Sequence, residues 1–409
     1  MGQVNEISMD AYAYDLPQDR IAEYPVDQRD QSRLLVMQDG IPGDDIFYKL
    51  PGYLPVGGMM VFNDTRVIRA RLVFFKDTGA RIEVFCLEPV LPSPEISQAF
   101  EAASPVTWKC LIGNAKKWRS GKLSIELKTA DGEVNFEAER IGEKDGVFLV
   151  QFSWDQAAIS FAGVLEAAGR VPLPPYIERD AEDGDVERYQ TIYARQDGSV
   201  AAPTAGLHFT EEVLNSIRRK KIDIEHVTLH VSAGTFKPVS HDDIRDHEMH
   251  NEQIIISRKL VEALIRNKGA VTAVGTTSMR TLESLYWFGS LLAQDPGADF
   301  SIQQWQPYDG NQDRVSKDEA LNNVLQHMEI SGKDEINGST SLIIIPSYQF
   351  RIVDILATNF HMPRSTLLLL VAAFAGEKWR DAYQYALDNG FRFLSYGDSC
   401  LFFRNDQKS

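Results

Sequence analysis

The sequence predicts an α/β (α+β) body built from both ends of the chain, with a small all-β barrel domain inserted in its N-terminal half. Two observations lead to this fold class. Short β-rich runs alternate with turns rich in Gly, Pro and Asp from Arg71 to Trp154, which is typical of a small barrel. After that segment strands alternate with helices, which indicates a layer of parallel strands. We therefore expect a catalytic body over 1–70 and 155–409 and an inserted domain over 71–154.

The elements of the body follow from hydrophobic periodicity and turn signals. Helices are expected over 159–169, 211–221, 259–269 and 279–289, and strands over 222–231 and 270–275. The chain then turns polar over 289–340, which we interpret as an insertion within the body that holds one helix, Asp318–Met328. Buried strands are expected again over 341–347 and 350–360. Next comes a helix with Ser365 or Thr366 as its N-cap.

Composition places the chain among ordinary globular proteins. The 409 residues, 44% hydrophobic and 24% charged, suffice for two or three domains. The longest apolar run, Thr366–Gly376, is shorter than the ~20 residues that span a bilayer, so it indicates a buried helix and no membrane segment. The N-terminal residues lack the pattern of a secretory signal, and we expect a cytoplasmic protein. The three scattered cysteines, Cys86, Cys110 and Cys400, indicate reduced, buried thiols.

The charge balance limits how nucleic acid could bind. The net charge of −16 argues against attraction over the whole surface, because phosphate binding needs a basic footprint. Any RNA would have to meet a local patch. Asn114–Lys122, with a tryptophan among basic residues, and Arg218–Lys221 are the two candidates, although both are equally typical of solvated faces.

Small and polar residues follow several of the predicted strands. After Val271–Val274 come Gly275, Thr276, Thr277 and Ser278 at the start of a helix. Open α/β sheets bind ligands at this end of their strands, and helix N-termini there offer unpaired N–H groups. Neither the P-loop spacing nor GxGxxG is present. Taken alone, these residues are as typical of a helix cap as of a ligand site.

Further segments repeat this design. They supply Asn63, Asp64, Thr65 and Arg66; Thr204, Gly206 and His208; His230 within a strand, then Gly234 and Thr235; and Asn359 with His361. Since a single sheet would bring these strand ends together, they predict a polar pocket assembled from distant parts of the chain.

Histidines are prominent in these segments. Three of the eight, His208, His230 and His361, lie in them, whereas His247 and His250 belong to "DHEMHNE". Each, taken singly, also fits a core or capping role. The HxxH spacing differs from the HExxH of zinc hydrolases, so a metal-dependent hydrolase is the weakest alternative and no metal is expected. No GxSxG elbow or activated cysteine points to a covalent nucleophile.

A series of long motifs carries a resemblance to a known family. The motifs include "VFNDTRVIRARL", "VAAPTAGLHFT", "VTLHVSAGTFKPV", "HEMHNE", "AVGTTSMRTLES", "LATNFHMPRSTLLLL" and "FRFLSYGDSCL". Together, from about Tyr14 to Leu401, they resemble the S-adenosylmethionine:tRNA ribosyltransferase-isomerases of queuosine biosynthesis.

The resemblance implies a particular reaction. S-adenosylmethionine would act as a ribosyl donor. Its ribosyl moiety would be transferred to 7-aminomethyl-7-deazaguanine at the wobble position of tRNA and isomerised, giving epoxyqueuosine with release of adenine and methionine. The resemblance also implies an α/β body with an inserted barrel, no metal, and a monomer whose partners are tRNA and S-adenosylmethionine.

This chemistry needs a general base, a proton donor for adenine and a dry pocket. His208 and His230 are the leading acid/base candidates, followed by His250 and His361. The expected binding residues hold ribose hydroxyls or the methionine end, shape the approach, or orient polar groups. They are Thr204, Gly206, Gly234, Thr235, Thr276, Thr277, Ser278, Asp64, Arg66, Arg280 and Asn359.

Departures from the family pattern leave alternatives open. Ser232, Met279 and Ser347 stand where other residues are usual, and the polar stretch 289–340 is longer than expected. These differences suit a paralogue that transfers a ribosyl or adenosyl group from S-adenosylmethionine to a different amine. A non-catalytic RNA-binding protein is a third reading, and it would consume no S-adenosylmethionine.

Overall fold

The computed structural model describes residues 6–129, 132–144, 146–231, 239, 241–309 and 315–404. Its larger part is a ten-stranded sheet in the order β16-β17-β14-β13-β3-β15-β18-β19-β1-β2. These strands are β1 (Arg33–Gln38), β2 (Ile41–Ile46), β3 (Met59–Asn63), β13 (Asp223–Leu229), β14 (Glu252–Ser257), β15 (Val271–Val274), β16 (Ser301–Ile302), β17 (Glu335–Thr340), β18 (Ile355–Asn359) and β19 (Ser399–Phe403).

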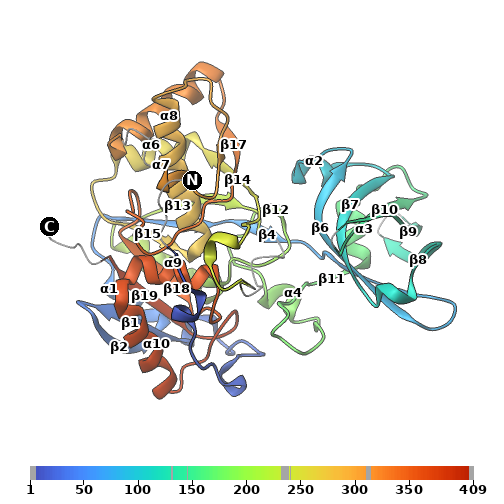
Figure 1. The fold of residues 1–409 in the computed structure, drawn as a ribbon, viewed down its shortest axis with the longest axis horizontal. Coiled ribbons are helices and arrows are strands. Elements are labelled where there is room, and N and C mark those ends of the chain that lie inside the picture. Colours follow the sequence, from blue (N-terminus) through green and yellow to red (C-terminus); the bar gives the residue numbers. More distant parts are fainter. Residues whose placement is uncertain are drawn as a thin grey trace.

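The centre of this sheet is parallel. Strands β13, β3, β15 and β18 run in one direction, whereas β14 and β19 flank them antiparallel. Every residue of β3 and of β18 is buried, as expected where helices cover both faces of a sheet. The mixed α/β class is therefore confirmed, although the sheet is mixed rather than wholly parallel. It joins strands from before residue 64 to strands from after residue 222 (Figure 1).

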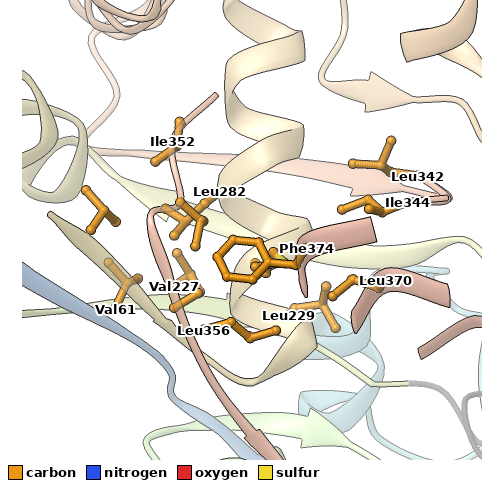
Figure 2. Close-up of a cluster of buried hydrophobic side chains, with 14 of the residues drawn as sticks. Val61, Val227, Leu229, Leu282, Leu342, Ile344, Ile352, Leu356, Leu370 and Phe374 are labelled. Carbon is orange, nitrogen blue, oxygen red and sulfur yellow. The ribbon is translucent and has the colours of Figure 1, made fainter. Parts of the chain in front are cut away.

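Helices cover both faces of the sheet and build its core. In Figure 2, Val61 of β3 and Leu356 of β18, the strands on either side of β15, lie in one cluster with Leu282 and Phe374, which belong to two of these helices. The helices of the body are α1 (Leu50–Tyr53), α4 (Asp185–Arg188), α5 (Glu211–Arg219), α6 (Arg258–Arg266), α7 (Gly275–Leu292), α8 (Lys317–Ser331), α9 (Thr366–Ala375) and α10 (Trp379–Asp388). As predicted, Ser365 caps α9, since its Oγ accepts from the N–H of Leu368.

A second, antiparallel sheet curls around its own core (Figure 1). Its order is β11-β5-β6-β7-β10-β9-β8, and the side chains of β10 alternate between fully and partly buried. The elements are β5 (Arg71–Phe75), β6 (Arg81–Leu91), α2 (Ile96–Glu101), β7 (Val106–Gly113), β8 (Lys122–Thr129), β9 (Gly132–Lys144), β10 (Val147–Trp154), α3 (Phe161–Ala168) and β11 (Gly169–Arg170). A parallel pair, β4 (Thr65–Val67) with β12 (Gln196–Ser199), lies between the two sheets.

The cysteines and the tryptophan of the basic patch 114–122 are buried in the hydrophobic cores. Cys86 and Cys110 are opposite each other on β6 and β7, and they and Cys400 are buried free thiols, as predicted. Trp118, the aromatic residue of the basic patch 114–122, is fully buried and donates its indole N–H to the carbonyl oxygen of Gly121. It is therefore not available to stack on a base.

Several predicted boundaries were wrong. Residues 341–347 form no strand, because the backbone N–H groups of Ser341 and Ile343 bond to the chain at 302–304 and the apolar run there reflects burial. His230 follows β13 rather than lying in it, and α7 begins at Gly275 rather than after Ser278. The polar stretch 289–340 contains the expected helix as α8, but it also adds β16 and β17 to the main sheet.

No helix in the described parts of the chain has both the length and the apolar character to cross a membrane.

A buried carboxylate fixes the turn that precedes β18. Glu283 of α7 accepts hydrogen bonds from the backbone N–H groups of Arg351, Ile352 and Val353 and from the hydroxyl of Tyr348, at 2.9–3.1 Å. It therefore ties α7 to the chain that enters the strand bearing Asn359.

We predict that Glu283→Gln lowers the free energy of unfolding by about 2–4 kcal/mol, because an amide N–H₂ would face buried donors. Urea denaturation of the full chain measures this. The matched control, Glu262→Gln on the exposed face of α6, should change stability by less than ~0.5 kcal/mol. Equal effects of the two changes would contradict the structural role.

Candidate active site at the strand ends

A cavity lies at the carboxyl ends of β15 and β18. Its walls come mainly from 202–205, Gly275–Thr277, Thr358–Met362, and Leu394 with Ser395, and are completed by Tyr176, Val231, Ser365 and Leu367. Of the described residues that line it, none carries an Asp, Glu, Lys or Arg side chain. The ionisable groups that face it are His361 and Tyr176. The predicted convergence of distant polar segments thus occurs at one edge of the sheet.

The N-terminus of α7 forms one wall. Gly275 has a φ of +88°, a left-handed conformation that glycine adopts without strain, and this lets the helix begin directly after β15. The N-cap is Val274, whose apolar side chain cannot cap the first turn. The N–H groups of this turn are therefore available to an anionic or polar ligand. Thr276 and Thr277 line the cavity beside them.

His361 lies in the cavity wall just after β18. Its Nε2 is 3.1 Å from the hydroxyl of Thr358, and its backbone N–H donates to the hydroxyl of Tyr383. The hydroxyl of Tyr14 donates to its carbonyl oxygen at 2.5 Å. Burial lowers the pKa of His361 to about 3. The imidazole is therefore neutral near pH 7 and has a lone pair that can accept a proton.

His208 lies behind this wall rather than in it. Its Nδ1 is 2.7 Å from the hydroxyl of Ser32, and its Nε2 is 3.3 Å from the amide nitrogen of Asn359, which does line the cavity. On the side away from Asn359, His208 lines a second, smaller pocket together with Arg29 and Arg188. Burial lowers the pKa of His208 to about 4. Asn359 therefore stands between the histidine and the cavity.

His230 directly follows β13 and Asp64 directly follows β3, and neither lines the cavity. The Nδ1 of His230 is 2.9 Å from the hydroxyl of Thr65, and burial lowers the pKa of His230 to about 4. Asp64 accepts a hydrogen bond from the hydroxyl of Thr228 at 2.7 Å, and burial raises the pKa of Asp64. The residue after His230, Val231, is the one that lines the cavity.

The structure brings together only some of the predicted site residues. Thr204, Thr276, Thr277, Asn359 and His361 line the cavity. Gly234 and Thr235 lie outside the described residues. The others, Ser278, Arg280, Arg66, His250 and Gly206, have different surroundings.

Two of these residues are buried in the core. Ser278 donates to the carbonyl oxygen of Val274 at 2.7 Å. Arg280 forms a buried ion pair with Glu252 and donates to the carbonyl oxygen of Leu342.

The other three lie elsewhere. Arg66 is more than half exposed, 3.8 Å from Asp197, and borders a separate hollow with Tyr189. His250 is exposed, and among the described residues no group of three or more His, Cys, Asp or Glu could hold a metal ion. Gly206 packs beneath Tyr193.

Sequence reasoning missed some of the lining. Tyr176 and Ser395 meet at the cavity, with their hydroxyl oxygens 2.5 Å apart, and Met362 lines it as well. Met362 and Ser395 lie in motifs that carry the family resemblance. No local spacing marked them, because their partners are distant in sequence.

A cavity at the ends of parallel strands, lined by hydroxyls, an amide and a neutral histidine, defines an α/β protein that binds a small polar ligand. The chain belongs to a family described as queuosine biosynthesis protein, whose model matches residues 9–402.

Near-full-length relatives support this assignment. One from Azoarcus sp. is 39% identical over 404 residues, covering 98% of this chain and 99% of the relative. Another, from Nitrosospira multiformis, is 39% identical over 396 residues, covering 95% and 97%. Both are named S-adenosylmethionine:tRNA ribosyltransferase-isomerase. A crystal structure of the S-adenosylmethionine tRNA ribosyltransferase from Thermotoga maritima matches with 28% identity and a TM-score of 0.45, covering 95% of this chain and 99% of that one.

The buried histidines make stability depend on pH. The folded-state pKa values of His361, His208 and His230 lie below the ~6.5 of an unfolded chain, so the unfolded state binds more protons between about pH 4.5 and 5.5. Stability therefore falls as the pH is lowered through this window. Each such histidine contributes a slope of about 1.4 kcal/mol per pH unit. We predict that His361→Gln reduces the slope by this amount in urea titrations, and an unchanged slope would contradict a neutral His361.

Gly206 packs so closely against Tyr193 that a substitution of Tyr193 should offset part of the destabilisation caused by a substitution of Gly206. A Cβ at Gly206 would lie 1.9 Å from the hydroxyl oxygen of Tyr193, so Gly206→Ala should cost about 1–3 kcal/mol in thermal or urea unfolding. That hydroxyl has no hydrogen-bond partner among the described residues. Tyr193→Phe alone should therefore cost under ~1 kcal/mol and should restore part of the loss in the double variant. Additive losses would show that this contact is not the cause.

Proposed function

We propose that this protein transfers and isomerises the ribosyl moiety of S-adenosylmethionine onto 7-aminomethyl-7-deazaguanine at the wobble position of tRNA, giving epoxyqueuosine and releasing adenine and methionine. The observation that carries this proposal is the similarity to relatives named for this activity, over 97–99% of their length. The three alternatives, a paralogue with another amine acceptor, an RNA-binding protein without activity and a metal-dependent hydrolase, have no comparable support.

The cavity offers what this chemistry needs. The sulfonium of S-adenosylmethionine makes the adjacent 5′ carbon acidic, so a positioned base can remove its proton. His361 is our leading candidate for that base, because its imidazole lines the cavity. Asp64, directly after β3, is the candidate for a proton donor to adenine, whereas burial holds His230 in its neutral form and so disfavours it as a donor. The raised pKa of Asp64 favours its protonated form, as a donor requires.

The methionine end and the nucleoside end of S-adenosylmethionine are suited to different walls of the cavity. The N-terminus of α7 and the hydroxyls of Thr276 and Thr277 are suited to the carboxylate of the methionine end. Thr204 and Asn359 are suited to the nucleoside. Apolar side chains, including those of Leu367 and Leu394, limit water in the remainder of the cavity.

The organisation of the chain is part of this proposal. We take residues 1–70 and 155–409 as the catalytic domain, with 289–340 as an insertion within it and 71–154 as an inserted barrel domain. A separate sheet and core support an inserted domain, and they include α3 and β11, which follow residue 154. We further propose a cytoplasmic monomer that meets the tRNA through a local basic surface.

We predict that the purified chain, given S-adenosylmethionine and an anticodon stem-loop carrying 7-aminomethyl-7-deazaguanine, releases adenine with a matching mass gain on the RNA. A stem-loop with guanine at the wobble position is the control and should gain no mass. His361→Gln should lower turnover by at least about 100-fold, as expected for loss of a general base. Binding of S-adenosylmethionine without either product would contradict the proposed acceptor, and full turnover by His361→Gln would remove this base.

A further inference from the structure

The side chain of Asn359 is held on one side and free on the other. Its Nδ2 donates to the carbonyl oxygen of Leu394 at 3.0 Å and lies 3.4 Å from that of Ser395 and 3.3 Å from Nε2 of His208. Its Oδ1 is buried and has no hydrogen-bond partner among the described residues. Since Asn359 lines the cavity, this oxygen is an unused acceptor in the ligand site.

The surrounding groups fix which way the amide points. Turning it over would place Oδ1 against the two carbonyl oxygens of Leu394 and Ser395, which offer only lone pairs. The nitrogen must therefore face the protein interior. A buried carbonyl oxygen without a donor is costly, and it is rare in native proteins unless a ligand or water supplies one.

The same reasoning fixes the tautomer of His208. Because the amide nitrogen of Asn359 is a donor, Nε2 of His208 has to accept. The proton is then on Nδ1, which donates to the hydroxyl of Ser32 at 2.7 Å. The ring is also packed against Phe47, with centroids 5.1 Å apart. His208 is thus oriented from behind and is directed at Asn359 rather than at the cavity.

We propose that Asn359 Oδ1 accepts a hydrogen bond from an N–H or O–H of S-adenosylmethionine, and that His208 is a positioning residue that holds Asn359 for this contact. The inference rests on the proposed function for the identity of the ligand. S-adenosylmethionine carries suitable donors on its adenine amine and its ribose hydroxyls. Asn359, at the end of β18, and Thr276, in the first turn of α7 directly after β15, line the same cavity.

Two substitutions of His208 separate positioning from acid/base catalysis. His208→Gln retains an acceptor near the position of Nε2, facing Asn359, whereas His208→Asn retains a polar group only near Nδ1, facing Ser32. We expect His208→Gln to keep the Kd for S-adenosylmethionine and kcat within about three-fold of the wild type. We expect His208→Asn to weaken binding by about ten-fold, the scale of one misplaced hydrogen bond. A role in proton transfer would instead lower kcat strongly in both, with Kd unchanged, and would overturn the proposal.

Substrate analogues test the contact of Asn359 itself. Asn359→Ala should weaken binding by about ten-fold. An analogue with a 6-oxo group in place of the adenine amine, and the 2′-deoxy and 3′-deoxy analogues, each remove one donor. The analogue that lacks the bonded donor should bind the wild type about ten-fold more weakly but should lose little further in Asn359→Ala. If each analogue is penalised equally in both proteins, Oδ1 makes no such contact.

A third measurement does not depend on the reaction. The ring nitrogens of His208 in the ¹⁵N-labelled full chain should show a protonated Nδ1 and an unprotonated Nε2 at neutral pH, with assignment by comparison with His208→Gln. A protonated Nε2 would overturn the proposed positioning of Asn359 by His208, even in an active enzyme. Conversely, the predicted tautomer in a protein that does not bind S-adenosylmethionine would support the contact from His208 to Asn359 but would reject the proposed function.

Discussion

The buried amide of Asn63 holds the ends of the central strands together. At the end of β3, its Oδ1 accepts from the backbone N–H groups of Leu229 and Thr65, and its Nδ2 donates to the carbonyl oxygen of Leu229 and to the hydroxyl of Thr277. A single fully buried side chain thus connects β3, the end of β13 and the first turn of α7. The cavity exists because these ends are fixed beside one another, and a sheet with parallel central strands puts them at the same edge.

Burial determines the electrostatic properties of the site. The described lining is uncharged, and His361, His208 and His230 are neutral for the same reason, since the sheet and its helices exclude water from their rings. In such surroundings the N-terminal dipole of α7 and a few hydroxyl and amide groups are less screened than in water. The proposed reaction suits this arrangement, because it needs a proton acceptor near a cation and little competing water.

Sequence reasoning predicted the elements with strong periodicity and the edge of the sheet where polar groups meet. The buried α9, the start of α5 at Glu211 and the convergence of Thr204, Thr276, Asn359 and His361 all followed from local patterns. It did not predict which polar residues face the cavity. Whether Arg280 points to a ligand or to Glu252 depends on a partner 28 residues away, and the same type of long-range contact turns His208 away from the cavity and toward Ser32.

The apolar segment 341–345 shows a second limit. Its composition is that of a buried strand, but its hydrogen bonds go to the chain near 302–304, so burial was predicted correctly and pairing was not. Hydrophobic periodicity indicates which side chains are buried, but it does not indicate which segment of the chain provides the backbone hydrogen-bond partners.

The most direct test of the central claim is a crystal structure of the protein with S-adenosylmethionine and without RNA. We expect the ligand in the cavity between α7 and β18, with its carboxylate at the N–H groups of Thr276 and Thr277 and a nucleoside donor at Oδ1 of Asn359. A ligand bound elsewhere, such as the hollow beside Arg66 and Tyr189, would contradict it.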